Sequence, residues 1–517
     1  MLHIHGKGHL KDTPQDLLSK IAIALFTMMS RILHAQKADG SWGCPEETAY
    51  ALITLANVVS LPLCAPIVDH VCSVIDAAKT FLLPSLHGRP QATPADRLWI
   101  DKVTYSVESF RDAYLISALN VSIPRYDPAS ITALPPISAT RVEELARFFG
   151  KLPTFKDVPM WRMLTWGIES SLFVPELNRV PSLTFASTEK AITGSWFEYL
   201  PFMIIAPISL EKAVVSPQGI LDILVVIRAL YHTDDYLDMT LNKETAEELL
   251  DLREKILALF SNPNSFSSPH SVPEGILPRH IDVIERFAYS LLSHPRVQLA
   301  SDRDKALLRS EIEHYFLSGL AQCQENLVLR ARGVENPHVG TSHYRWIHNI
   351  GVDNIAGFIG LSFVLCLVGH NVNAERGQRV SVDVFPTPML KYLFNDCAMH
   401  MSAYSRLCND LHGIPRDKRE INLNSTFFPE FSGPRSGTDD DNARIVALLE
   451  VVEFERKCAN NGFEELCHRF TPFVGSQSAR NTVNFIRILY VHTELYDELV
   501  EATSSDISNY AVESTSS

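Results

Sequence analysis

Three aspartates near the end of an apolar run are the residues of this chain best placed to bind a metal. Asp234, Asp235 and Asp238 follow residues 220–230, which read as a buried helix. Asp234 and Asp238 are four positions apart, so on a helix their side chains project from one face, one turn apart. Carboxylates at the mouth of an apolar cavity are costly unless a cation binds them, and oxygen ligands suit Mg2+. This spacing alone also fits a solvated acidic helix face.

A second group of side chains suited to a metal is Asn409, Gly413 and Asp417, at a strict four-residue spacing. On one helix this spacing aligns an amide oxygen with a carboxylate, and the glycine between them leaves room for a water ligand. Arg416 and Lys418 flank Asp417, where they can hold an anionic phosphate beside the metal. A polar helix end with alternating charges would explain this cluster alone. The two clusters together favour a magnesium site that binds phosphates.

The composition of the chain excludes several classes of function. Its 517 residues exceed one typical core, so we expect two structural units, and a content of 46% hydrophobic and 21% charged residues is typical of a globular protein. The net charge of −14 argues against a nucleic-acid partner and against electrostatic docking on an anionic membrane. The cysteines include no CxxC pair, which favours a reducing compartment. We therefore expect a cytoplasmic location.

Two apolar stretches read as too short to cross a bilayer. Residues 21–30 follow polar residues, and residues 355–369 read better as a buried core helix. No membrane span is therefore expected. His3, His5 and His9 would bind a transition metal only adventitiously, and we interpret them as stray histidines of the N-terminus.

Helical periodicity dominates the chain and β-type alternation is nearly absent, so the predicted fold class is all-α. A stretch rich in Pro, Ser and Thr at residues 120–140 predicts a boundary between two units. The first unit would cover residues 1–130 and the second residues 140–503. Residues 504–517 form a Ser/Thr-rich tail that we expect to be disordered.

Several motifs, in a fixed order, resemble those of class I terpene synthases. The most specific is the block of residues 409–431, which joins an NSE-type metal motif to an NLNS…FPEF sequence. Gln36, Gly40 and Trp42 match a QxxxGxW pattern seen at helix ends in terpenoid-cyclase barrels, where the indole packs over a turn and the amide ties a helix terminus. Further similar segments are residues 46–52, 99–105, 198–202 and 344–348. The chain looks closest to the C-terminal half of fungal bifunctional copalyl diphosphate/kaurene synthases.

The resemblance implies a class I terpenoid synthase α domain, preceded by a truncated helical remnant of the class II β domain. It also implies three Mg2+ ions that clamp a prenyl diphosphate substrate. The metal ligands implied by motif match are Asp234, Asp235, Asp238, Asn409, Gly413 and Asp417, of which Asp234, Asp238, Asn409 and Asp417 are the catalytic residues. The implied diphosphate-binding residues are Arg416, Lys418 and Arg345. Metal ions and cationic side chains would neutralise the leaving diphosphate, so that the allylic C–O bond ionises.

The resulting carbocation must be sheltered from water by an apolar, aromatic-lined wall. The candidate lining residues are Trp196, Phe197, Tyr199, Phe202, Tyr231, Phe363 and Tyr404. Ordinary core packing explains each of these aromatic residues equally well.

Three departures from the family pattern narrow what the resemblance implies. No DxDD motif is present, so we do not expect this chain to make copalyl diphosphate by class II chemistry. Pro415 lies inside the second metal motif, where a proline costs ~3 kcal/mol in a helix interior, so we expect a bend or a distorted turn there. Residues 203–208 are more apolar than the Asn-bearing segment of kaurene-forming relatives, which argues against a kaurene-type product.

The resulting hypothesis is a Mg2+-dependent class I terpene cyclase that releases a terpene hydrocarbon or alcohol, favoured as a diterpene synthase acting on geranylgeranyl or copalyl diphosphate. One alternative is a sesquiterpene synthase acting on farnesyl diphosphate, because the class II machinery is missing. An alternative of another class is a non-catalytic partner of a class II cyclase. A prenyltransferase that makes linear chains would carry two DDxxD-type motifs, whereas the second cluster here has the cyclase form.

Several further properties stay open at the level of sequence. A separate class II cyclase or prenyltransferase would supply the substrate, and a homo-oligomer is compatible with the resemblance. The product skeleton and the quenching of the cation, by water or by deprotonation, depend on the shape of the cavity.

Overall fold

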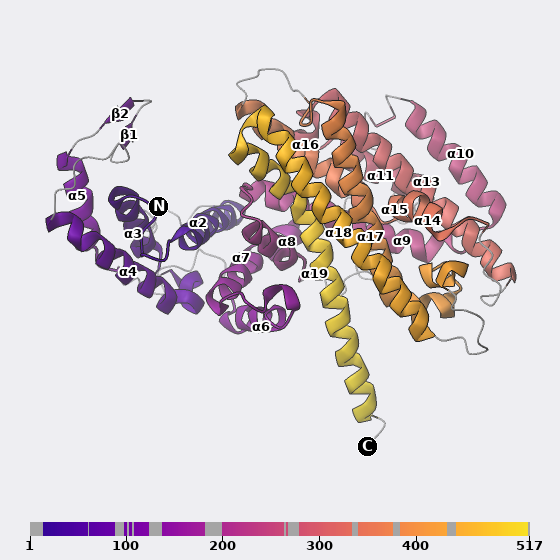
Figure 1. Cartoon of the computed structure of the whole chain (residues 1–517), viewed down its shortest axis with the longest axis horizontal. Coiled ribbons are helices and arrows are strands. Elements are labelled where there is room, and N and C mark those ends of the chain that lie inside the picture. The colour runs from indigo at the N-terminus through magenta and orange to yellow at the C-terminus, as the bar shows by residue number, and fades with distance from the viewer. Residues whose placement is uncertain are drawn as a thin grey trace. The chain divides into compact units, whose positions relative to one another are not determined.

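The computed structural model of this chain describes residues 14–59, 61–87, 98–100, 103–105, 108–123, 137–180, 199–262, 265–266, 279–332, 340–375, 383–431 and 441–514 (Figure 1). The chain divides into two compact units, Met1–Arg179 and Val180–Ser517.

The first unit is helical apart from one short antiparallel strand pair. Its elements are α2 (Gln15–Ala35), α3 (Pro45–Val58), η1 (Pro62–Ile67), α4 (Val68–His87), β1 (Leu98–Ile100), β2 (Val103–Tyr105), α5 (Glu108–Leu119), α6 (Ala139–Phe149), η3 (Pro153–Phe155) and α7 (Met160–Arg179). Helix α7 packs against both α2 and α6. Phe26, Phe149 and Trp166 are fully buried in this unit. Helices α6 and α7 follow the boundary predicted at residues 120–140, yet the compact first unit extends to Arg179 and includes both helices. The assignment of the two units to cyclase domains stays a prediction.

The QxxxGxW segment stabilises the turn between α2 and α3, as predicted. The Gln36 side-chain amide donates to the carbonyl oxygens of Gly40, at 3.1 Å, and Val74, at 3.0 Å. The Trp42 indole donates to the carbonyl oxygen of Ile32 at 2.6 Å, which ties the turn to the last part of α2. Gly40 has a φ of +85°, and a Cβ there would lie 2.7 Å from the carbonyl oxygen of Ala77. Only glycine fits this turn without strain.

Helix α2 is the one single helix of the described residues that is long and apolar enough, by length and composition, to cross a membrane. The stretch, residues 16–35, is longer than the apolar run at 21–30 that the sequence suggested. Two further pairs of helices, each bent at a short break, are long and apolar enough to cross a membrane only if the two helices of a pair are counted as one span. Half of the α2 stretch is buried within the structure, and the Thr27 hydroxyl donates to the buried carboxyl of Glu169 in α7 at 2.6 Å. In this structure α2 packs within the first unit, and its buried residues contact other helices of that unit.

The second unit is built from helices that surround the buried helix α16. Its elements are α8 (Leu200–Leu210), α9 (Pro217–Leu241), α10 (Ala246–Ser261), α11 (His280–Leu292), α12 (Pro295–Gln298), α13 (Asp302–Arg332), α14 (His343–Trp346), the π-helical turn η5 (Ile347–Gly351), α15 (Val352–Asn354), α16 (Gly357–Glu375), α17 (Pro388–Glu420), η6 (Ser425–Phe427), η7 (Pro429–Phe431), α18 (Asp441–Val474) and α19 (Ser476–Ser514). The prediction of an all-α fold is confirmed, and α17 and α18 run side by side (Figure 1). Residues 359–368 of α16 are buried, which confirms the core helix predicted there.

Helices α9 and α17 carry the two predicted clusters, and both begin with strong local signals. The Ser216 hydroxyl accepts the Gly219 N–H at 3.1 Å before α9, and Thr387 caps α17 in the same way. A proline follows each cap at the first helical position, where its missing N–H costs nothing. Helix α17 continues through Pro415 and ends at Ile421, whose φ is 55°. One helix therefore carries the whole second cluster.

Candidate active site

The two clusters predicted from the sequence meet at one small polar cavity in the second unit. This cavity has a volume of about 50 Å³. Its lining includes Asp234 and Asp238 from α9, and Asn409, Arg416 and Asp417 from α17. Packing of distant segments thus brings together carboxylate and amide oxygens that lie far apart along the chain.

The α9 carboxylates face the cavities and differ in exposure, since Asp234 is half-buried whereas Asp235 and Asp238 are exposed. Asp234 is half-buried, and its Oδ1 accepts a hydrogen bond from the hydroxyl of the buried Tyr315 at 3.1 Å. Enclosure by the protein, and then the neighbouring Asp238, raise the pKa of Asp234 to about 7. Enclosure also raises the pKa values of Asp235 and Asp238. A bound cation would relieve both the poor solvation and the repulsion between Asp234 and Asp238.

The carboxyl group of Asp417 is held in place by two donors. Asp417 is 3% exposed, its Oδ2 accepts from the Asn424 side-chain amide at 2.8 Å, and its Oδ1 accepts from Nε of Arg416 at 3.2 Å. A Cβ at Gly413 would lie 2.7 Å from Asp417 Oδ2. The glycine therefore leaves the space that this orientation of Asp417 needs.

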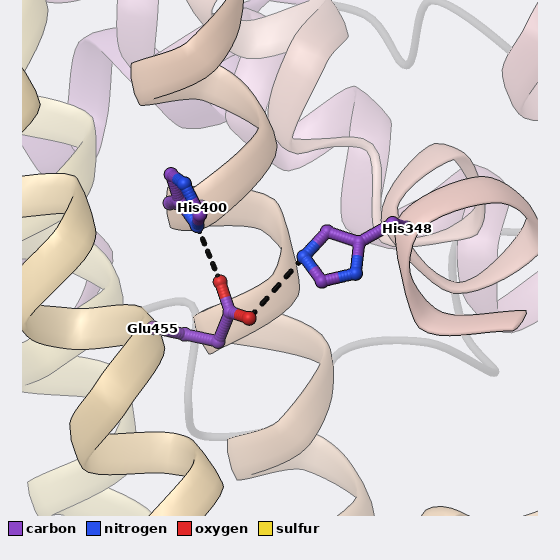
Figure 2. Close-up of side chains that lie close together, drawn as sticks. All are labelled: His348, His400 and Glu455. Atoms are coloured by element: carbon purple, nitrogen blue, oxygen red, sulfur yellow. Dashed lines mark hydrogen bonds and ion pairs between the residues drawn. The ribbon is translucent and has the colours of Figure 1, made fainter. Parts of the chain in front are cut away.

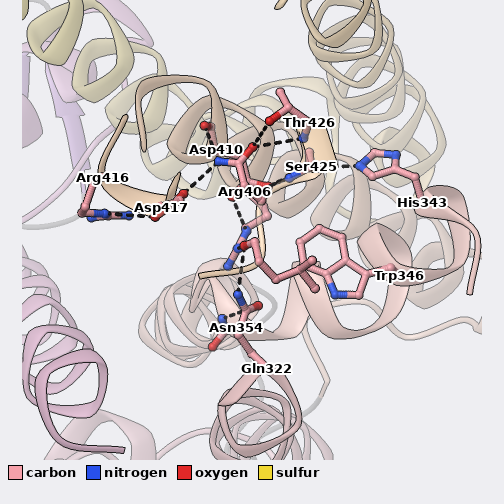
Figure 3. Close-up of polar contacts among 12 residues, drawn as sticks. Gln322, His343, Trp346, Asn354, Arg406, Asp410, Arg416, Asp417, Ser425 and Thr426 are labelled. Carbon is pink, nitrogen blue, oxygen red and sulfur yellow. Dashed lines mark hydrogen bonds and ion pairs between the residues drawn. The ribbon is translucent and has the colours of Figure 1, made fainter. Parts of the chain in front are cut away.

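A buried ion pair, Arg406 with Asp410, lies beside Asp417 of the second cluster (Figure 3). Arg406 and Asp410, one turn apart on α17, approach to 2.9 Å, and the Arg406 guanidinium lies 5.1 Å above the ring of Trp346. Asp410 Oδ2 accepts from the backbone N–H and the hydroxyl of Ser425, at 3.0 and 2.6 Å. The Asn424 amide also donates to the Asp410 carbonyl oxygen at 2.7 Å. These contacts fix the segment that follows α17 against the helix, and Arg406 also lines the polar cavity.

A second, larger cavity of about 280 Å³ shares Asp234, Asp238 and Asn409 with the polar one. The rest of its wall is mostly apolar and comes from α9, α16, α17 and α19. Among its lining residues are Ile227, Leu230, Tyr231, Ile355, Met401, Leu489, His492 and Tyr496. Tyr231 and Tyr496 lie with ring centroids 6.0 Å apart, and the Tyr231 hydroxyl lies 3.4 Å from Nε2 of His492. The site thus joins an end lined by carboxylates and arginines to a mostly apolar chamber.

The structure distributes the other sequence-predicted residues as follows. Tyr231 lines the larger cavity, as does Asp235. Tyr199, Phe202, Phe363 and Tyr404 line neither of these two cavities of the described residues, and the last three are buried in the core. The cations Lys418 and Arg345 also lie outside the linings of these two cavities, and Arg345 is exposed. Trp196 and Phe197 fall outside the residues that the structure describes.

Sequence reasoning missed four residues of the site. Arg406 and Tyr496 line the cavities, while Tyr315 and Asn424 hold the carboxylates of Asp234 and Asp417. Arg406 lies three positions before Asn409, so helical spacing would have placed the two on neighbouring faces. Tyr315 has no such local signal because it comes from α13.

The donor set fits a hard divalent cation. Asp234, Asp238, Asn409 and Asp417 offer only oxygen atoms that such an ion prefers, and two of these carboxylates have pKa values raised by enclosure. Gly413, predicted beside a water ligand, does not line the polar cavity, and the space next to it is taken by Asp417 Oδ2. The role of each residue as a ligand stays a prediction.

Comparisons with known proteins connect this site to a family. No protein-family model and no solved structure matches the chain. Bifunctional premutilin synthases of Rhodocybe pseudopiperita and Clitopilus passeckerianus are 63% and 62% identical over 509 residues, which is 98% of this chain and 53% of each relative. A pimaradiene synthase of Emericella nidulans is 26% identical over 90% of this chain and 50% of its own length.

The chain therefore spans about half the length of the curated relatives that it matches. The alignments with the premutilin synthases cover 98% of this chain, and the motifs that resemble class I terpene synthases lie within the same region. By this similarity, which covers 98% of the chain and about half of each premutilin synthase, the chain resembles class I terpene synthases, in particular the fungal bifunctional enzymes.

Proposed function

We propose that this chain is a class I diterpene cyclase that ionises a C20 prenyl diphosphate and cyclises the carbocation. The observation that carries the proposal is the convergence of the α9 and α17 clusters beside an apolar cavity of about 280 Å³. The names of the relatives, premutilin synthase and pimaradiene synthase, support the C20 class.

The proposed metal ligands are Asp234 and Asp238 on one side and Asn409 and Asp417 on the other. When bound there, Mg2+ would supply Lewis-acid chemistry that neutralises a leaving diphosphate. Tyr315 and Asn424 orient one carboxylate of each cluster, at 3.1 and 2.8 Å. The number of ions, three by family resemblance, is part of this proposal.

The diphosphate itself would be held by cationic side chains. Arg416 lines both cavities, and its guanidinium offers planar N–H groups that suit phosphate oxygens. Although enclosure opposes it, the pKa of Arg416 is raised by Asp417 and Asp238, so the side chain stays charged. Arg406 adds a second cation at the polar end, already fixed by Asp410 and Trp346. Donors that are fixed before the reaction stabilise developing negative charge without a cost for reorganisation.

The apolar cavity would fold the hydrocarbon chain and keep water from the cation. Ile227, Leu230 and Leu489 offer no lone pair for attack, and the rings of Tyr231 and Tyr496 present aromatic faces that attract a passing cation. The shape of this wall would decide which ring system forms.

The substrate class can be tested directly with the isolated chain. The chain is incubated with Mg2+ and, separately, with geranylgeranyl, copalyl and farnesyl diphosphates, and products are identified by mass spectrometry. We expect a cyclic diterpene from one of the C20 substrates. The cavity of about 280 Å³ lies just below the ~300–1,000 Å³ typical of ligand pockets, which keeps the smaller C15 substrate in the test. A product from farnesyl diphosphate alone would establish the sesquiterpene alternative.

A substitution in each cluster tests the proposed site. Asp234→Asn and Asp417→Asn should each lower turnover by at least about 100-fold, because charge stabilisation in the transition state is lost. Asp251→Asn, on the exposed face of α10, is the matched control and should keep full activity. Full activity in both cluster variants would refute the site. No turnover of any prenyl diphosphate by the unaltered chain would instead favour a non-catalytic partner of a class II cyclase.

A further inference from the structure

A cluster of two histidines and a glutamate lies in the second unit, outside the residues that line the two cavities. Figure 2 shows His348, His400 and Glu455, which come from η5, α17 and α18. One ligand atom from each residue can be chosen so that all three lie within 4.8 Å of one another. Three segments distant in the sequence thus point metal-ligating atoms at one place.

The distances suit a single small ion with little rearrangement. Nε2 of His348 lies 3.2 Å from one carboxylate oxygen of Glu455, and Nδ1 of His400 lies 2.6 Å from the other. Tetrahedral ligands held ~2.0–2.1 Å from zinc are roughly 3.3 Å from each other. The His348–Glu455 distance already matches that separation, and the His400–Glu455 contact would have to open by less than about 1 Å.

The orientation of His348 directs Nε2 to this place. Nδ1 of His348 lies 3.0 Å from the carbonyl oxygen of Tyr344. A carbonyl only accepts hydrogen bonds, so Nδ1 carries a proton. In the ion pair with Glu455, Nε2 carries a proton as well, and a metal that binds there would replace that proton and use the freed lone pair. A hydrogen bond from one ring nitrogen to a backbone carbonyl commonly orients histidines that bind metals through the other nitrogen.

The surroundings combine a buried charge with access from solvent. The Glu455 side chain is 2% exposed, and both ion-pair partners that the described part of the chain gives it are these histidines. The side chains of His348 and His400 are 14% and 20% exposed. A buried carboxylate favours a bound cation, and the partly open imidazoles leave an entry path and a position for water.

We propose that His348, His400 and Glu455 form a second metal site, which binds a divalent transition metal of the Zn2+ type and not Mg2+. Imidazole nitrogen suits zinc, whereas Mg2+ prefers oxygen ligands alone. The site is separate from the proposed magnesium clusters. His400 precedes Asn409 by nine residues on α17, which places the two side chains about 180° apart around the helix and roughly 13 Å apart along it.

A metal at this site would fasten η5 to α17 and α18. The segment after η5 includes Ile355, which lines both cavities, and α17 carries the second cluster. The ion would therefore stabilise the scaffold of the active site without contact with the substrate. The inference does not depend on the proposed function, because metal binding can be measured without turnover.

The test measures binding of Zn2+ and Co2+ to the untagged chain in an excess of Mg2+. His3, His5 and His9 are replaced by glutamine, so that the N-terminal histidines cannot bind the added metal. We expect one Zn2+ per chain in a chelator-competition assay, a Co2+ visible spectrum typical of nitrogen and oxygen ligands, and no displacement by Mg2+. Absence of Zn2+ binding would overturn the proposal.

Variants locate the ion. His348→Gln and Glu455→Gln should weaken Zn2+ binding by more than the ~10–100-fold that loss of a hydrogen-bond partner of a ligand typically costs. His280→Gln removes a histidine that pairs with a single glutamate, Glu244, at 3.1 Å, and should leave Zn2+ affinity unchanged. Unchanged Zn2+ affinity in the double variant of His348 and Glu455 would place the ion elsewhere and refute the site.

X-ray absorption of the Zn2+-loaded chain with all three residues intact gives an answer that does not depend on how the variants fold. Scattering from two imidazole rings is expected, and a spectrum without imidazole would also refute the site.

Discussion

At the scale of single residues, Tyr315 is the contact that ties the pKa of Asp234 to the rest of the fold. Its hydroxyl donates to Asp234 Oδ1 at 3.1 Å, and this hydrogen bond opposes the enclosure and the neighbouring Asp238, which together leave the pKa of Asp234 raised to about 7. In the proposed site, Asp234 would bind a cation as the carboxylate. Tyr315 therefore helps to keep Asp234 ready for a metal near neutral pH.

Tyr315→Phe should raise the pH below which Mg2+ binding is lost. Without the hydroxyl, the pKa of Asp234 rises further, so a higher pH is needed to ionise it, and Mg2+ affinity at pH 7 should fall by ~10–100-fold. Calorimetric titration with Mg2+ across pH 6–9 measures the shift. Tyr392→Phe, at a residue that is 69% exposed, is the control and should bind Mg2+ as the unaltered chain does. The same pH midpoint in both variants would contradict the role of Tyr315.

Gly413→Ala should reduce turnover without unfolding the chain. The new Cβ would lie 2.7 Å from Asp417 Oδ2, so the carboxylate has to move from its place between Asn424 and Arg416. A displacement of 1 Å in a catalytic group can cost about 100-fold in rate, and steady-state kinetics would measure this loss.

Gly319→Ala is the matched control for this substitution. Gly319 also lies in a helix and lines the polar cavity, but a Cβ there would lie 3.5 Å from its nearest neighbour, an ordinary contact. Equal losses of activity in the two variants would show that the cavity is merely sensitive to added volume.

At the scale of elements, α17 depends on the segment that returns over its last turns. Residues 422–426 lie beside the helix after Ile421 ends it, and Asn424 is fully buried there. Its amide donates both to the Asp410 carbonyl oxygen and to Asp417. The NLNS sequence is thus a support for the second cluster, and Pro415 is tolerated in a helix that packs along its length against α18.

Asn424→Ala should destabilise the second unit and displace Asp417. Removal of the amide leaves buried acceptors on Asp410 and Asp417 without this donor, which typically costs about 1–3 kcal/mol. Chemical denaturation would measure the loss in the free energy of unfolding. Asn57→Ala, which removes an exposed amide bonded only to the Ile53 carbonyl oxygen, should cost less than about 0.5 kcal/mol. Equal costs at the two sites would argue that Asn424 is not a support.

At the scale of the whole molecule, all proposed ligands belong to one of the two compact units. The α9 and α17 clusters and both cavities lie within Val180–Ser517, whereas Met1–Arg179 has its own core around Phe26, Phe149 and Trp166. A ligand of the site should therefore stabilise the second unit specifically.

Mg2+ with inorganic pyrophosphate should raise only one of two unfolding transitions. A ligand at 100 times its dissociation constant adds about 2.7 kcal/mol to the unit that binds it. Scanning calorimetry would resolve the transition of the second unit moving to higher temperature while that of the first stays in place. Asp234→Asn, which weakens the site, should abolish the shift. An equal shift of the whole profile would show that the two units unfold together.

The residues that the sequence placed correctly are those whose spacing is fixed by a single helix. Asp234 and Asp238, or Asn409 and Asp417, share a face because the helical repeat is local, and the QxxxGxW turn is local for the same reason. Phe363 and Tyr404, expected as candidates for the cavity wall, are buried outside both linings. An aromatic residue in an apolar helix fits the core and a cavity equally well by its sequence.

The helical class, the metal-type side chains and their spacing are legible in the sequence, because these follow from 3.6 residues per turn and from the chemistry of the groups. Packing in three dimensions brings α9 and α17 to one polar cavity, lets Tyr315 and Asn424 hold their carboxylates, and makes His348, His400 and Glu455 meet. These contacts join segments distant along the chain. They are selected by the packing of the whole unit, which no local pattern records.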